Sequence, residues 1–283
     1  MIWWNSFLLA FSLFSRIPVP RAEWKAENMR YMLCFFPFVG AVISCAVTVL
    51  FYLSLILFLT PSVPALLLVL IPFFISGGIH LDGFCDTCDA LASRAEKERK
   101  LEILKDSRCG AGAVISCAAY FTAYFALAFE FSAACVEDLR AIEVESLTGV
   151  SAIWRFAAES SLAPFASAFV LSRTLSALAA ATFPCAKTSG MLRAFSDNSA
   201  RLFSAIWCVS LFAAVCAFDI WFFKAAGCFV AGASLLVFAF YFVSARRNFG
   251  GITGDTAGWF VQLCELVSLL SIVIFRGFLR RIA

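Results

Sequence analysis

The chain has few charged residues and only one histidine. Of its 283 residues, 14% are Asp, Glu, Lys or Arg, and 62% are hydrophobic. Soluble globular domains have roughly a quarter charged residues and about half apolar ones, so an ordinary soluble domain is excluded. The sequence also contains no zinc signature, no Ser-His-Asp set, no Walker-type loop and no nucleic-acid motif. We therefore expect no nucleic-acid partner.

A convincing cleavable signal is also lacking. Residues 1–14 are apolar, but no positive region precedes them and no small-x-small site follows. We expect a short interfacial helix here, anchored by Trp3 and Trp4. The twelve cysteines lie mostly inside apolar runs, where cysteine behaves as a small hydrophobic residue. The close pair Cys85 and Cys88 lacks the second ligand pair of a zinc or redox site.

Long apolar segments, by contrast, occur along the whole chain. Runs of about 20 apolar residues suffice to cross a bilayer as α-helices. The sequence predicts an all-α, polytopic integral membrane bundle, one domain over residues 1–283, with no internal repeat. About seven spanning segments are expected, at residues 29–59, 65 into the acidic motif, 112–131, 151–183, 202–223, 226–245 and 256–275. The acidic linker 133–151 is expected to be an exposed loop.

Lysine and arginine gather in alternate loops. The basic segments are residues 16–30, 93–108, 184–201 and 246–255, and the loops between them carry almost no Lys or Arg. Because basic loops stay on the cytoplasmic side, the polar motifs are expected on the cytoplasmic face of the bacterial inner membrane. The basic tail (Arg276, Arg280 and Arg281) breaks the pattern. Either one segment is miscounted, or the tail is an interfacial segment with snorkelling side chains.

Three aspartates, Asp82, Asp86 and Asp89, follow the apolar run of residues 65–76. If the run continues as helix, they fall within roughly a 60° arc over about 10 Å. Like charges repel, and each is costly to desolvate near the bilayer. A cation offsets both costs, and hard oxygen ligands favour Mg²⁺ or Mn²⁺ bridging to phosphate. A solvated acidic helix end and the ion path of a transporter are the alternatives.

Two further segments carry groups suited to phosphate chemistry. Arg108 can bind phosphate bidentately or simply flank the membrane, and Asp106 is a candidate metal ligand or base. The glycine-rich loop at residues 250–255 opens onto a helix, so its backbone N–H groups can approach a phosphate. The candidate substrate-binding residues in this loop are Gly251, Thr253, Gly254 and Asp255, with Asp255 expected as a ligand or the helix N-cap.

Two charged residues lie inside expected spanning segments. An intramembrane ionisable residue is costly and marks a function by default, which makes Glu265 a candidate. Arg173 either binds substrate or pairs with a buried acid, and the residues leave both interpretations open. His80 is expected to tune the metal site or cap a glycine bend. Gln262 follows Asp255 by seven residues on the same helix face.

The run GGIHLDGFCDTCDAL at residues 77–91, followed by LEILKDSRCGAG at 101–112, resembles the cobalamin synthase family, adenosylcobinamide-GDP ribazoletransferase. Further matches follow in order over most of the chain, at SRIPVP (15–20), Ser172-Arg173 and GGITGDTAG (250–258). The first and last runs together are highly specific. The chain departs from the family at Gln262, usually Glu, and at Trp259, usually Ala, which weakens position 262 as a metal ligand.

The resemblance implies a Mg²⁺-dependent membrane transferase, with Mn²⁺ as a substitute. It would join adenosylcobinamide-GDP and α-ribazole (or its 5′-phosphate), releasing GMP and forming adenosylcobalamin (or its 5′-phosphate). The ribazole 3′-hydroxyl would attack the cobinamide-linked phosphorus. The implied metal ligands are Asp82, Asp86 and Asp89, the catalytic residues are these and Asp106, and the substrate-binding residues are His80, Arg108, Arg173, Gly251, Thr253, Gly254, Asp255 and Glu265.

An association with other cobalamin-assembly enzymes and with the lipid bilayer is also expected. Two rival functions remain at this stage. A CDP-alcohol-phosphotransferase-like lipid enzyme also stacks aspartates on membrane helices, but its Asp-x-x-Asp-Gly-x-x-Ala-Arg opening is missing. A cation-coupled transporter would place its ionisable groups near the membrane midplane, often in related halves, whereas here they gather at one face.

Overall fold

The structure is a computed structural model that describes residues 1–282 apart from positions 59, 107, 145–160 and 188–189. In the described part of the chain, every regular element is a helix, which confirms the all-α prediction. The helices are α1 (Ile2–Phe14), α2 (Ala26–Met29), α3 (Met32–Phe58), α4 (Ser62–Ser76), α5 (Ile79–Ala92), α6 (Lys97–Ile103), α7 (Ala111–Val144), α9 (Leu162–Thr182), α10 (Met191–Asn198), α11 (Arg201–Phe223), α12 (Ala225–Phe249) and α13 (Gly254–Ile282).

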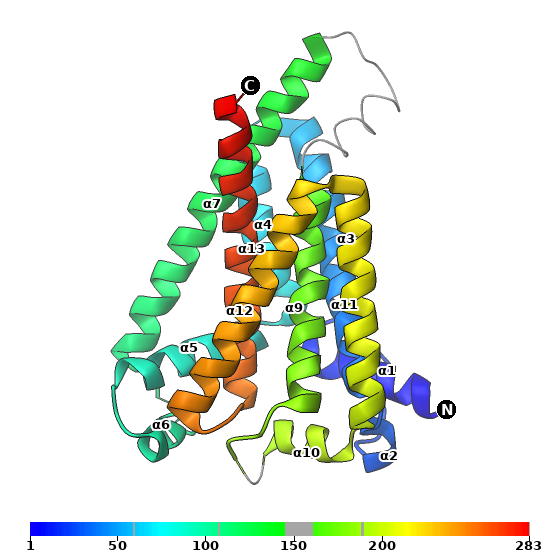
Figure 1. The fold of residues 1–283 in the computed structure, drawn as a ribbon, viewed down its shortest axis with the longest axis vertical. Coiled ribbons are helices and arrows are strands. Elements are labelled where there is room, and N and C mark those ends of the chain that lie inside the picture. Colours follow the sequence, from blue (N-terminus) through cyan, green and yellow to red (C-terminus); the bar gives the residue numbers. More distant parts are fainter. Residues whose placement is uncertain (59, 107, 145–160, 188–189, 283) are drawn as a thin grey trace.

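Six of the described helices, α3, α7, α9, α11, α12 and α13, are long and apolar enough to cross a membrane. The bent pair α4 and α5 makes a seventh if it is counted as one span. The protein is therefore a polytopic integral membrane protein with the expected number of spans. The six long helices run roughly along one direction, whereas α5 lies across one end of the bundle (Figure 1).

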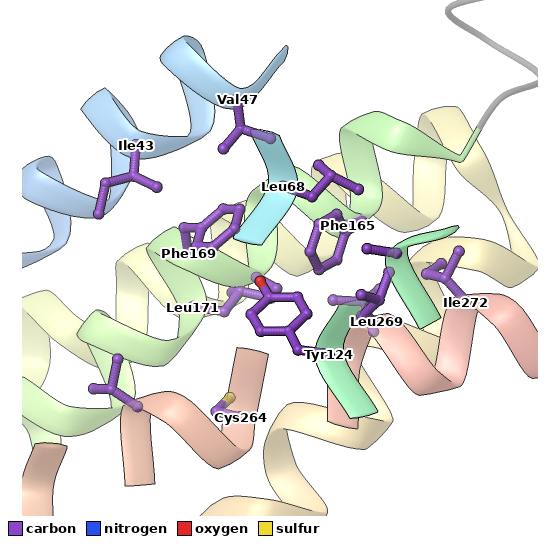
Figure 2. Close-up of a cluster of buried hydrophobic side chains, with 14 of the residues drawn as sticks. Ile43, Val47, Leu68, Tyr124, Phe165, Phe169, Leu171, Cys264, Leu269 and Ile272 are labelled. Atoms are coloured by element: carbon purple, nitrogen blue, oxygen red, sulfur yellow. The ribbon is translucent and has the colours of Figure 1, made fainter. Parts of the chain in front are cut away.

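The core is built around α9, which packs against α3, α11, α12 and α13. Phe165 and Phe169 of α9 meet Tyr124 of α7 and aliphatic side chains of α3, α4 and α13 (Figure 2). At Gly40 of α3 a side chain would collide with the carbonyl group of Phe169. A small residue at this crossing lets the two backbones approach closely, which is how membrane helices gain packing energy.

The sequence pattern predicted the three aspartates on one face on the condition that the apolar run continues as helix into the acidic motif. That condition is not met, because the run ends at Ser76 and a second helix begins at Ile79. Gly77 and Gly78 both adopt left-handed conformations, with φ of 66° and 80°, which glycine reaches without steric cost. As a result α5 is bent by 96° from α4. The backbone N–H of Arg16 donates to the carbonyl of Ile75 at 2.8 Å, and the Arg16 side chain lies across Gly77. The bend is thereby fixed by the N-terminal segment.

The prediction of an exposed acidic loop from residue 133 was wrong, because α7 continues to Val144. Two acids in this stretch pair with arginines of the last helix, Asp138 with Arg276 and Glu137 with Arg280. The basic tail therefore belongs to α13 and lies at the end of the bundle opposite α5 (Figure 1). The expected start of the fourth span at residues 151–160 lies outside the described residues.

The basic segments gather at one end of the bundle, as the alternation of charged loops predicted. The helices α2, α5, α6 and α10 and the turn between α12 and α13 all lie at that end (Figure 1). The acidic motif and the glycine-rich loop are consequently brought to the same edge of the molecule.

Candidate functional site

The site forms where α5 crosses the beginning of α13. A Cβ on Gly83 would lie 2.7 Å from the carbonyl oxygen of Asp255, and a Cβ on Gly258 would lie 2.8 Å from that of His80. Only glycine allows this approach, because small residues let helix backbones pack in direct contact. The crossing brings the acidic face of α5 next to Asp255.

The carboxylates at this crossing influence one another. Burial, followed by the nearby charges of Asp82, Asp255 and Asp89, raises the pKa of the half-buried Asp86 carboxyl to about 6. Within the described residues, none of the three α5 aspartates forms an ion pair. The positive charge that acts on Asp86 is that of Lys187, whose Nζ lies 3.6 Å from Oδ2 of Asp255. Negative charge therefore exceeds positive charge at this crossing, which favours an added cation.

Asp89 lies further along α5 and touches a different element. Its carboxylate packs against Gly110 and Gly112, where α7 begins, so a side chain at Gly110 would collide with it. Asp89 thus connects α5 to the segment that carries Arg108. All three aspartates lie on α5, and the predicted role of Asp89 as a metal ligand beside Asp82 and Asp86 stays a prediction.

The donor set suits a metal ion shared with a substrate. In the described part of the chain, no three His, Cys, Asp or Glu side chains are close enough to hold a metal by themselves. Mg²⁺ is usually bound through one or two carboxylates together with substrate phosphates and water, rather than in an all-protein cage. The hard oxygens of Asp82, Asp86 and Asp255 fit that kind of site. The Mg²⁺ or Mn²⁺ site remains a prediction.

The glycine-rich loop is held rigidly beside these carboxylates. Ile252 N–H donates to the carbonyl of Pro184, and Ala186 N–H donates to the carbonyl of Ile252, both at 2.9 Å. Gly251 has no room for a Cβ, which would lie 2.7 Å from the Ala186 nitrogen. The loop is thus pinned to the connection between α9 and α10, which also carries Lys187.

Thr253, rather than Asp255, caps α13. The N–H of Thr256 donates to Oγ1 of Thr253 at 3.1 Å, and the N–H of Thr253 donates to Oγ1 of Thr256 at 2.9 Å. Such reciprocal bonds satisfy donors that a helix start otherwise leaves unpaired. Of the two roles expected for Asp255, the capping role is therefore taken by its neighbour, and its carboxylate faces the site.

Two cavities meet at Asp255. The larger, of about 270 Å³, lies between α1, α3, α5, α9, α10 and α13 and is lined mainly by apolar side chains. The smaller, of about 140 Å³, includes Lys187, Arg193 and the loop residues Thr253 and Gly254. Lys187 was not among the predicted site residues, and the signal for it in the sequence was its place in a basic loop.

His80 lines the larger cavity. It is buried, and its ring lies 6.2 Å from that of Phe14 and 5.5 Å from that of Phe36. Its Nε2 has no hydrogen-bond partner among the residues that the structure describes. The imidazole thus packs between the aromatic rings that line this cavity.

Asp106 and Arg108 pair with each other on the surface. The Arg108 guanidinium donates to both carboxylate oxygens, from Nε at 3.0 Å and from Nη2 at 2.8 Å. These hydrogen bonds lower the pKa of the Asp106 carboxyl to about 2. Their predicted roles toward metal and phosphate remain predictions, and Ser107 between them lies outside the described residues.

Arg173 and Glu265 form a buried ion pair in the interior of the bundle. Arg173 Nη1 lies 2.5 Å from Oε1 of Glu265, and both side chains are almost fully inaccessible. The same nitrogen donates to the carbonyl of Phe169 at 3.0 Å. This contact matches the second of the two interpretations of Arg173, a pair with a buried acid. Neither residue lines the two cavities at Asp255, and a substrate-binding role for either stays a prediction.

Comparison with known proteins identifies the family. Residues 6–273 match the family model described as cobalamin-5-phosphate synthase. An adenosylcobinamide-GDP ribazoletransferase of Lachnoclostridium phytofermentans is 38% identical over 98% of this chain and 96% of its own length. One of Geobacillus kaustophilus is 32% identical over 93% of both chains. No solved structure is significantly similar. The resemblance in the sequence motifs is thereby confirmed, and the chain belongs to the cobalamin-5-phosphate synthase family.

Proposed function

We propose that this protein is an adenosylcobinamide-GDP ribazoletransferase, which completes the nucleotide loop of cobalamin. Relatives with that name are similar to this protein over nearly its whole length. The structural observation that carries the proposal is the meeting of unpaired α5 carboxylates, Asp255 and a pinned glycine-rich loop at one edge of the bundle. This combination suits a phosphoanhydride substrate, because such reactions need charge neutralisation and an aligned hydroxyl nucleophile.

In this proposal the protein's own groups position the two substrates. Asp82, Asp86 and Asp255 would hold Mg²⁺, which when bound supplies charge neutralisation at the phosphoanhydride. Lys187 in the smaller cavity would contact the remaining phosphate oxygens. Arg193 of the same cavity is already paired with Asp197 at 2.7 Å, so it would bind the phosphate oxygens less strongly than Lys187.

The transfer itself is a substitution at phosphorus. The 3′-hydroxyl of the ribazole acceptor would form a new O–P bond to the phosphate linked to cobinamide. The phosphoanhydride bond to GMP would break, and GMP would leave. A carboxylate at the mouth of the site would take the hydroxyl proton, which such groups do when hydrogen-bonded to the nucleophile.

We further propose that the site faces the cytoplasm at the bacterial inner membrane. The support is the gathering of basic segments at the α5 end of the bundle (Figure 1), since positively charged loops are retained on the cytoplasmic side. Both substrates would then reach the site without crossing the bilayer.

The test uses the full-length protein purified in detergent. With adenosylcobinamide-GDP, α-ribazole and Mg²⁺, GMP and a cobalamin product should form together, and omission of either substrate should abolish both. Chelation of the divalent ion by EDTA should stop the reaction, and Mg²⁺ should restore it. Failure to form GMP would refute the transferase, and ion flux through proteoliposomes without substrates would support a transporter instead.

A further inference from the structure

The larger cavity has a lining unlike that of the carboxylate site next to it. Aromatic and aliphatic side chains from the three helices α1, α3 and α10 surround it, namely Leu13, Phe14, Leu33, Phe36, Leu192 and Phe195. Small residues of α9, Ala177 and Ala180, leave the space open. Its polar side chains are few, and two of them, Asp82 and Asp255, belong to the proposed phosphate site. The cavity therefore suits a flat, apolar group attached to a polar one.

The size of the cavity limits its occupant. Pockets for small molecules begin at roughly 300 Å³, so about 270 Å³ holds a nucleoside-sized group and not a corrinoid ring. Guanine is a poor match as well, because each of its several polar edge atoms would need a hydrogen-bond partner when buried. A benzimidazole-type base, with apolar edges and one unsubstituted ring nitrogen, needs only one.

His80 supplies one such partner. Its side chain is more than nine-tenths buried, it lines this cavity, and its Nε2 makes no hydrogen bond to any described residue. A buried polar atom without a partner is uncommon and calls for an explanation. A neutral imidazole that carries its proton on Nε2 can donate one hydrogen bond to a ring nitrogen, and Phe14 and Phe36 flank it.

We propose that this cavity binds the aromatic base of the ribazole acceptor, with His80 donating from Nε2 to the unsubstituted ring nitrogen. The inference rests on the proposed function and assigns the acceptor half of that site. The sugar then lies at the edge of the cavity formed by Asp82 and Asp255, which brings its hydroxyl to the carboxylates. The smaller cavity with Lys187 is left for the phosphates of the donor.

The test measures binding of each substrate half separately to the full-length protein in detergent. Radiolabelled α-ribazole and GDP are titrated in parallel by equilibrium dialysis. His80→Phe keeps an aromatic side chain but removes both ring nitrogens, and Ala180→Phe fills the cavity. The matched control is Ala119→Phe, an exposed position on α7. We expect both test variants to weaken α-ribazole binding by about tenfold or more, as for one lost buried hydrogen bond. GDP binding should stay within about twofold.

The unaltered protein gives a second test that does not depend on a variant folding. A benzimidazole riboside should displace α-ribazole about tenfold better than adenosine, whose base has more unsatisfied polar atoms. Equal competition by the two ribosides would overturn the assignment, as would variants that weaken GDP binding and leave α-ribazole binding unchanged. GMP release tests the proposed function separately. If the protein binds α-ribazole in this way but releases no GMP, the transferase proposal is refuted and the assignment of the cavity still holds.

Discussion

The two ends of the bundle use acidic residues in opposite ways. At the end where α7 and α13 finish, two acids whose side chains the structure describes are paired with cations, Asp138 with Arg276 and Glu137 with Arg280. At the other end, the three aspartates of α5 form no ion pair within the described part of the chain, and Asp255 contacts the partly buried Lys187. Paired charges of the first kind tie helices together. At the α5 end, the close contact of α5 and α13 at Gly83 and Gly258 holds an excess of carboxylates together. Such a group is suited to bind an added cation.

The largest effect on stability is expected between the two ends, at the buried pair. Arg173→Met leaves Glu265 uncompensated in the interior, so the free energy of unfolding should fall by about 3–5 kcal/mol. The melting temperature in detergent measures this loss. The double variant Arg173→Met/Glu265→Met should recover most of it, because well-packed apolar residues can replace a buried ion pair. A single variant with unchanged melting but weaker donor binding would support the substrate-binding interpretation.

The largest effect on activity is expected at the unpaired end. Asp86→Asn keeps the shape of the side chain but removes its charge, and GMP release should fall about 100-fold, which corresponds to about 2.7 kcal/mol of transition-state stabilisation. The melting temperature should not fall, because no ion pair of Asp86 is lost among the described residues. Full activity in this variant would remove Asp86 from the site.

A smaller loss is expected when the helix crossing is disturbed. Gly258→Ala places a Cβ against the carbonyl of His80 and should push α5 away from α13. We expect GMP release to fall about tenfold, since small misplacements of catalytic groups are costly, and stability to fall by about 1–3 kcal/mol. The control is Gly277→Ala on the same helix, where a Cβ meets nothing within 4 Å. Equal behaviour of the two variants would show that the close crossing has no role.

The smallest effect is expected at the paired end. Asp138→Asn weakens one partly exposed ion pair with Arg276, which should lower the free energy of unfolding by about 1 kcal/mol or less. GMP release should stay within about twofold of the wild type. A large loss of activity here would contradict the division of the molecule into a structural and a functional end.

The sequence predicted the parts of the fold that depend on composition alone. The spans α11 and α12 begin and end within a few residues of their apolar runs, because only a tight turn at Lys224 separates them. The gathering of polar motifs at one end followed from counting Lys and Arg in successive loops. Both arguments need only local information, and both predictions were confirmed.

Ion pairs between residues far apart in the chain could not be predicted from local sequence patterns. The acidic end of α7 was interpreted as a loop because its partner Arg276 lies 138 residues away in the chain. For the same reason, Glu265 could not be identified as the partner of Arg173. The angle between α4 and α5 at Gly77 and Gly78 could not be predicted, because an apolar run gives no information about the direction in which the helix continues. Only the adjacent glycines pointed to it.

The central claim is that the excess carboxylates at the α5 end bind a divalent ion together with a nucleotide phosphate. The most direct measurement titrates Mn²⁺ by electron paramagnetic resonance into the purified protein with GDP present. The account predicts that Asp86→Asn weakens Mn²⁺ binding by about tenfold or more and that Asp138→Asn binds as the wild type does. Unchanged Mn²⁺ affinity in Asp86→Asn, or an equal loss in both variants, would contradict it.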